Sequence, residues 1–159
     1  MAKARGRKAT GPRFLRDAPS ETPLYVSDFA DGKIYRIGPT SVSIDIKPGS
    51  DPNSINPRSK DVIPVAILTT NIADGDPLDF DATQIDATTV RFGPNGAGIA
   101  HAQEHIEDVD DDGDSDLLLH FRTQAKGIAC GDTTATLTGE TFSGDAIAGS
   151  DSIKTVGCK

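Results

Sequence analysis

Residues 107–121 read Glu-Asp-Val-Asp-Asp-Asp-Gly-Asp-Ser-Asp-Leu-Leu-Leu-His-Phe, an acidic loop that runs directly into an apolar segment. Leu117, Leu119 and Phe121 recur at every second position, which is the pattern of a strand with one buried face. The alternating carboxylates before them match the first nine positions of a calcium-binding loop. Gly113 stands where such a loop turns most sharply, and glycine reaches positive φ without a steric penalty. This stretch predicts an ion-binding connection that leads into a strand.

Calcium is a hard cation that takes six to eight oxygen ligands. The expected ligands are three alternate side chains, one main-chain carbonyl and a ninth-position carboxylate that binds directly or through water. They are, in order, Asp108, Asp110, Asp112, the carbonyl of Asp114, and Asp116. A further oxygen would come from Glu107, the Asp114 side chain, Asp51 or water.

Two other interpretations of the loop stay open, a magnesium or nonspecific divalent site and a solvated acidic turn without an ion. Five aspartates fall within residues 110–116, and their mutual repulsion in a compact loop disfavours the ion-free turn. An EF-hand would place a bidentate Glu at position twelve and a helix on each side. Position twelve here is Leu119, within the expected strand, so the sequence departs from an EF-hand. The loop is similar instead to the Asp-x-Asp-x-Asp-Gly-x-x-Asp loops of FG-GAP and integrin-type blades, and that resemblance implies a structural calcium site.

The chain has 159 residues and a net charge of −8, which is distributed unevenly. Residues 1–40 contain eight basic and four acidic side chains, whereas residues 41–159 contain eight basic and twenty acidic ones. Phosphate contacts require Lys and Arg, so the acidic part is not expected to bind nucleic acid. No apolar run approaches the roughly 20 residues that a membrane-spanning helix needs.

Cys130 and Cys158 are the two cysteines of the chain, and we expect them to form a disulfide. Such a bond would stabilise the fold by about 3–4 kcal/mol on the chain-entropy estimate. A disulfide indicates an oxidising compartment, so the expected location is extracellular or at the cell surface. Residues 1–17 are basic and lack an apolar core, so this chain shows no recognisable secretory signal.

Short apolar or alternating segments separated by Gly and Pro indicate an all-β fold, an antiparallel β-sandwich of immunoglobulin-like or jelly-roll-like type. Residues 1–23 are expected to be a disordered basic tail, residues 24–40 a β-hairpin or linker, and residues 41–159 the calcium-binding sandwich. The apolar run at residues 62–68 predicts a central strand, with Pro64 near its start or on a bulge. Residues 79–88 are expected to hold one helical turn.

Residues 44–158 resemble a poorly characterised β-rich module found near the ends of secreted bacterial proteins. The resemblance rests on Ile44–Ser50, Val62–Leu68, Val90–Pro94, the acidic loop and Gly149–Ser152. It implies an extracellular accessory domain and supplies no activity. Residues 24–37 also resemble the strand-turn-strand element of an NHL-type propeller blade, present here in a single copy.

His101, His105 and His120 are the three histidines of the chain, and they flank the acidic loop. A zinc site would require all three to converge as neutral imidazoles. Scattered surface histidines are the plainer interpretation, and the sequence leaves their role open.

The sequence is compatible with three functions. The expected one is a non-catalytic, calcium-stabilised extracellular module for structure or adhesion, in contact with another extracellular protein. The first alternative is a carbohydrate-binding module appended to a secreted enzyme, with a polysaccharide as partner, although residues 41–159 contain no Trp or Tyr on which sugars could stack. The second alternative is a small metal-dependent hydrolase using the acidic cluster or the histidines.

Overall fold

The computed structural model describes residues 24–28, 33–101 and 105–158. The chain divides into two units, residues 1–37 and residues 38–159. In the first unit, β1 (Leu24–Asp28) pairs antiparallel with β2 (Lys33–Ile37), and Leu24 lies opposite Ile37. The expected disordered tail of residues 1–23 lies outside the described residues.

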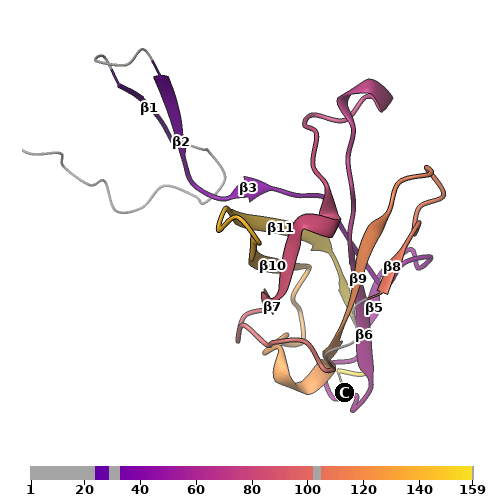
Figure 1. Ribbon diagram of the computed structural model, residues 1–159. Helices are drawn as coiled ribbons and strands as arrows, with labels where there is room; N and C mark the ends of the chain where they lie inside the picture. The colour runs from indigo at the N-terminus through magenta and orange to yellow at the C-terminus, as the bar shows by residue number, and fades with distance from the viewer. Residues whose placement is uncertain (1–23, 29–32, 102–104, 159) are drawn as a thin grey trace, which may run out of the picture. The chain divides into compact units, whose positions relative to one another are not determined.

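The second unit contains two four-stranded sheets (Figure 1). The first has the order β3-β11-β10-β7. Its strands are β3 (Thr40–Ser41), β11 (Ala146–Ser152), β10 (Thr134–Thr141) and β7 (Ile85–Phe92). All of its pairings are antiparallel except the short parallel contact of β3 with β11.

The second sheet has the order β4-β6-β9-β8 and is antiparallel throughout. Its strands are β4 (Ile44–Ile46), β6 (Val62–Ile67), β9 (Asp116–Arg122) and β8 (His105–Glu107). A separate parallel pair joins β5 (Ser54–Ile55) to β12 (Lys154–Thr155). The described residues of this unit also form three single-turn 3₁₀ helices: η1 (Ile72–Asp74), η2 (Ala82–Gln84) and η3 (Thr123–Ala125).

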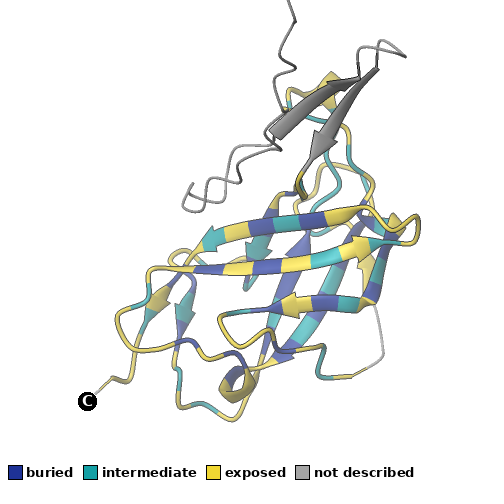
Figure 2. Ribbon diagram, turned by 90° about the vertical axis from the view of Figure 1, so that its left-hand side faces the viewer, coloured by how far each residue is buried: buried dark blue, intermediate teal, exposed yellow. Residues whose placement is uncertain are grey.

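The core is formed by the inward faces of both sheets. Along β9, the side chains of Leu117, Leu119 and Phe121 are buried, and Leu118 and His120 between them are only partly so. Figure 2 shows the same alternation as dark and light bands along the strands. Phe121 meets Phe92 of β7 with ring centroids 5.1 Å apart, so these two rings join one sheet to the other.

The predicted all-β antiparallel sandwich is confirmed. The central position of residues 62–67 is also confirmed, because β6 lies between β4 and β9. Pro64 is the third residue of β6, and its carbonyl accepts a hydrogen bond from the amide of Lys47 at 2.9 Å. The helical turn expected within residues 79–88 is η2, capped by the Asp81 side chain, which accepts from the amide of Thr83.

Candidate metal centre

The acidic loop connects the edge strand β8 to β9, whose ends lie opposite each other at Glu107 and Asp116. The backbone of this hairpin connection turns through positive φ at Asp111 (62°) and at Gly113 (98°). Gly113 takes the left-handed conformation at the position where the sequence pattern requires it. Aspartate is among the few other residues that tolerate this region, which accounts for Asp111.

Carboxylates of the loop accept hydrogen bonds from the loop's own backbone. The two oxygens of Asp108 accept from the amides of Asp112 (3.1 Å) and Gly113 (3.0 Å). Asp112 in turn accepts from the amide of Asp114 at 2.8 Å. These bonds fold the loop back toward its first residue and bring its side-chain oxygens inward.

Asp116 ties the loop to the rest of the sheet. Its side chain is fully buried, and its two oxygens accept from the amides of Val109 and Thr69, both at 2.8 Å. The hydroxyl of Thr69 also donates to the carbonyl of Ser115 at 2.6 Å. Thr69 lies just beyond the end of β6. Asp116 therefore links the start of the loop, at Val109, to the segment that follows this central strand.

Three of the predicted ligands, Asp108, Asp110 and Asp116, each place a carboxylate oxygen within 4.8 Å of the other two. Calcium–oxygen distances of about 2.4 Å put two ligands on opposite sides of one ion about 4.8 Å apart. The three oxygens therefore fit around a single cation. Each carboxylate oxygen has two lone pairs, so the hydrogen bonds to backbone amides leave capacity for a metal.

The side chains of Asp112 and Asp114 lie outside this group of three. One oxygen of Asp112 accepts from the Asp114 amide, and the charge of Asp74 in η1 acts on Asp114. An ion held by the three gathered carboxylates needs further oxygens, for which the carbonyl of Asp114, the other loop carboxylates and water are candidates.

Burial and crowded negative charge raise the pKa of two carboxyl groups in the loop. Partial burial, followed by the charges of Asp112, Asp116 and Asp108, raises the pKa of Asp110 above its usual value. Desolvation and the neighbouring carboxylates, including Asp74, also raise the pKa of Asp114. A cation at the centre of the three carboxylates would relieve this repulsion.

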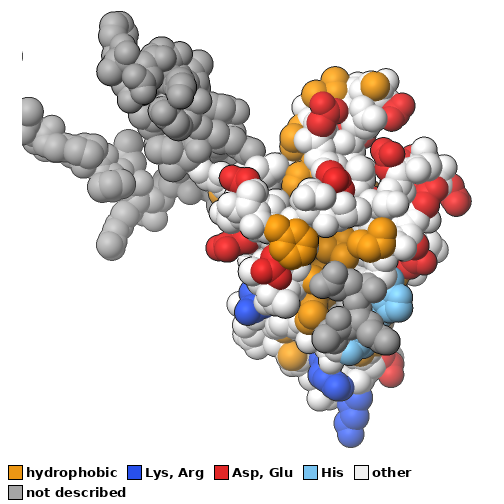
Figure 3. Space-filling view, viewed as in Figure 1, with side chains coloured by type: hydrophobic (Ala, Val, Ile, Leu, Met, Phe, Trp, Pro, Cys, Tyr) orange, Lys and Arg blue, Asp and Glu red, His pale blue; other side chains and the backbone are white. Residues whose placement is uncertain are grey.

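The structure adds a second acidic loop that the sequence pattern does not place beside the first. The segment from Thr69 to Asp81 carries Asp74, Asp76, Asp79 and Asp81. A shallow hollow between the two loops is lined by Thr69, Asp79, Asp81 and Asp114, among others. In Figure 3, which has the same view as Figure 1, acidic side chains gather over the end of the molecule where Figure 1 places the two loops. Thr69 and Asp74 meet the loop from more than 30 positions away, and no local sequence signal could have found them.

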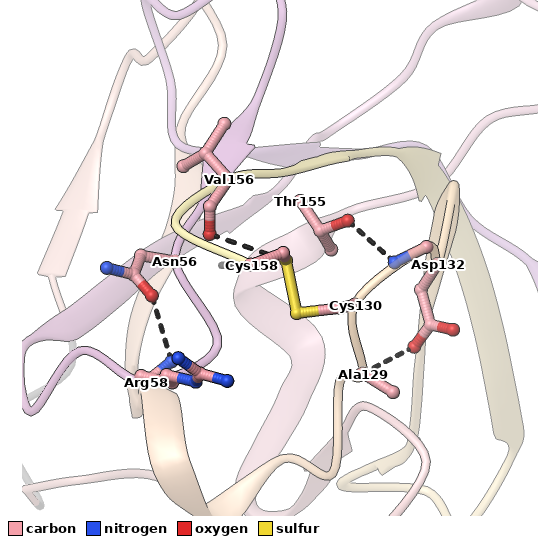
Figure 4. The surroundings of a disulfide bond; sticks show 9 residues. Asn56, Arg58, Ala129, Cys130, Asp132, Thr155, Val156 and Cys158 are labelled. Atoms are coloured by element: carbon pink, nitrogen blue, oxygen red, sulfur yellow. Dashed lines mark hydrogen bonds between the residues drawn. A yellow bond between two sulfur atoms is a disulfide. The ribbon is translucent and has the colours of Figure 1, made fainter.

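Cys130 and Cys158 form a disulfide with Cα atoms 5.8 Å apart (Figure 4). It links the segment that follows β12 to the segment that precedes β10, where the amide of Gly131 also donates to the hydroxyl of Thr155 at 2.9 Å. A disulfide is compatible with an extracellular protein. The described part of the chain contains no helix with the length and apolar character needed to cross a membrane.

No family model, curated protein or solved structure matches the chain.

Proposed function

We propose that the chain is a non-catalytic extracellular module for structure or adhesion, stabilised by one calcium ion in the loop between β8 and β9. The observation that carries the proposal is the gathering of the Asp108, Asp110 and Asp116 carboxylates within 4.8 Å of one another. Calcium is favoured because all three donors are hard carboxylate oxygens on an irregular turn. Magnesium demands near-ideal octahedral geometry and usually keeps several waters.

In this proposal the ion links the loop of the β8–β9 hairpin to the segment that follows β6. The three carboxylates would hold it, with the carbonyl of Asp114 and water as further oxygens. Asp116 is bonded to the amide of Thr69, so a bound ion would restrain both the hairpin and the exit of β6. Binding to the folded state alone adds its free energy to the stability of the fold.

The location and the non-catalytic role rest on separate observations. The disulfide supports an oxidising compartment. The carboxylates of Asp108 and Asp116 are bonded to backbone amides, which suits holding the loop in shape. The resemblance of the loop to FG-GAP and integrin-type loops also favours a structural ion.

Calorimetric titration of the purified chain with calcium tests the proposal. One ion per chain is expected, and Asp110→Asn should weaken binding at least tenfold because it removes a ligand charge. Asp111→Asn is the matched control. It removes the same charge one residue away, and asparagine also tolerates the positive φ of that position. Equal calcium affinity in the two variants would refute the assignment of the ligands.

A further inference from the structure

The three histidines of the chain meet on the second sheet. The ring centroids of His101 and His120 lie 5.1 Å apart, those of His105 and His120 5.6 Å, and those of His101 and His105 6.3 Å. His101 and His105 are exposed, and His120 is partly buried. In Figure 3 the pale blue histidine atoms lie at the surface of the molecule.

The pairing of β8 with β9 creates this cluster. His105 lies opposite Leu118, and alternation along β9 puts Leu118 and His120 on the same face of the sheet. The amide of Ala100 donates to the carbonyl of His120 at 2.7 Å, which fixes the position of the neighbouring His101. Two separate backbone contacts thus bring His101 and His105 to one side chain of a central strand.

The ring separations match those of imidazoles that share one metal ion. Zinc–nitrogen distances are about 2.0–2.1 Å, so in a tetrahedral site two ring centres lie about 5 Å apart. Two of the observed separations, 5.1 and 5.6 Å, are close to that value, and the third, 6.3 Å between His101 and His105, exceeds it by about 1.3 Å. Among the described residues the three histidines are not a group whose ligand atoms all lie within 4.8 Å of one another, so the exposed rings of His101 and His105 must rotate to direct nitrogen atoms at a common point.

The protonation state of His120 also suits a ligand. Nδ1 of His120 is buried, and no hydrogen-bond partner reaches it within the described part of the chain. Burial, together with His101 and His105, lowers the pKa of His120, although the charge of Glu107 opposes the shift. A neutral imidazole is the form that coordinates a metal.

We propose that His101, His105 and His120 form a second metal site, selective for a divalent transition ion and best suited to zinc, with water in the fourth position. It differs from the carboxylate loop in donor chemistry, because imidazole nitrogen suits zinc and copper, whereas carboxylate oxygen suits calcium. The proposed zinc site does not depend on the calcium site of the proposed function.

Zinc titration of the calcium-saturated protein, against a chromophoric chelator, tests the site. One zinc ion per chain is expected, and His105→Ala should weaken zinc binding at least tenfold. His105 is exposed on an edge strand, so its replacement leaves the core intact. Asp110→Asn should leave zinc affinity within twofold when calcium is present at a concentration that saturates this variant as well, which separates the two sites. Cobalt added in place of zinc should give the intense visible absorption of a tetrahedral site, and His101→Ala should abolish it.

Three outcomes would overturn the inference. Zinc could bind the wild type and His105→Ala equally, or not bind the wild type at all. Zinc binding could also be lost in Asp110→Asn and retained in His105→Ala, in which case zinc occupies the carboxylates. The calcium titration is a separate measurement, so failure of the histidine site would leave the proposed function standing.

Discussion

Asp116 and Asp110 share the metal centre but differ in what each does without an ion. Asp116 is fully buried and accepts from the amides of Val109 and Thr69, whereas Asp110 is exposed. Asp116→Asn keeps one acceptor oxygen and faces the other amide with a donor, so one buried amide loses its partner. Such a loss costs about 1–3 kcal/mol.

Asp116→Asn should therefore lower the free energy of unfolding by about 1–3 kcal/mol even in excess chelator. Asp110→Asn should leave stability in chelator unchanged or slightly higher, since it relieves repulsion, and should reduce only the calcium-dependent part. Urea unfolding in chelator compares the two variants. If both lose the same stability there, the two carboxylates have the same role and the division drawn between them is wrong.

Lys126 is a buried residue that makes the stability of the fold depend on pH. It is fully buried, and its ammonium nitrogen lies 4.8 Å from the centre of the Phe92 ring and 5.8 Å from that of Phe121. Burial lowers the pKa of Lys126 from 10.5 to about 7. Between these two values the unfolded chain binds more protons than the folded one, so this group makes stability rise with pH from about 7 to 10.5.

Lys126→Met should stabilise the protein by about 1–3 kcal/mol at pH 6, where the buried amine is charged, and by less at pH 9. Methionine is unbranched and one atom shorter than lysine, and it removes the donor that lacks a partner within the described residues. Urea unfolding at both pH values measures the difference. A variant less stable than the wild type at pH 6 would mean that attraction to the two aromatic rings outweighs the cost of burial.

At the scale of elements, β11 lies close to β4 at Gly149. A Cβ atom there would come within 2.8 Å of both the Ile44 methyl Cγ2 and the carbonyl oxygen of Val42. Gly149→Ala should therefore cost about 1–3 kcal/mol, because the backbone oxygen cannot move aside cheaply. Gly98→Ala, whose nearest neighbour would be the Arg91 guanidinium at 3.7 Å, is the control and should change stability by less than about 0.5 kcal/mol. Equal thermal unfolding midpoints for the two variants would contradict this packing.

The disulfide acts on the C-terminal element. Cys130 and Cys158 close a loop with a sequence separation of 28, and reduction should cost about 3–4 kcal/mol on the chain-entropy estimate. Reduction should lower the urea midpoint of unfolding. The double variant Cys130→Ser, Cys158→Ser should show the same decrease. An unchanged midpoint would show that the hydrogen bonds of β12 with β5 and with Gly131 hold this segment without the disulfide.

At the scale of the whole molecule, the sequence predicts those features that arise from local patterns. Alternation at Leu117, Leu119 and Phe121 correctly assigned the buried face of β9, and the apolar run at residues 62–68 correctly predicted the central strand. The spacing of aspartates around Gly113 pointed to the group that gathers Asp108, Asp110 and Asp116. Each of these signals lies within about ten residues.

The remaining features depend on contacts between distant segments. The parallel pairings of β3 with β11 and of β5 with β12 join residues about 100 positions apart. The bond from Thr69 to Asp116 and the meeting of His101 with His120 likewise arise only once the strands are assembled. One sequence carries no local signal for such contacts. Which of the predicted carboxylates come together, namely Asp108, Asp110 and Asp116, also depends on the folded loop.

The central claim is that calcium in the loop between β8 and β9 stabilises the sandwich. The most direct test is the thermal unfolding midpoint with saturating calcium and with excess chelator. Calcium at about 100 times its dissociation constant adds about 2.7 kcal/mol, which should raise the midpoint by roughly 10 °C in a unit of this size. The chelator should reverse the rise, and Asp110→Asn should lose about half of it or more at the same calcium concentration, while Asp111→Asn retains it. A midpoint that neither calcium nor chelator changes would contradict the claim.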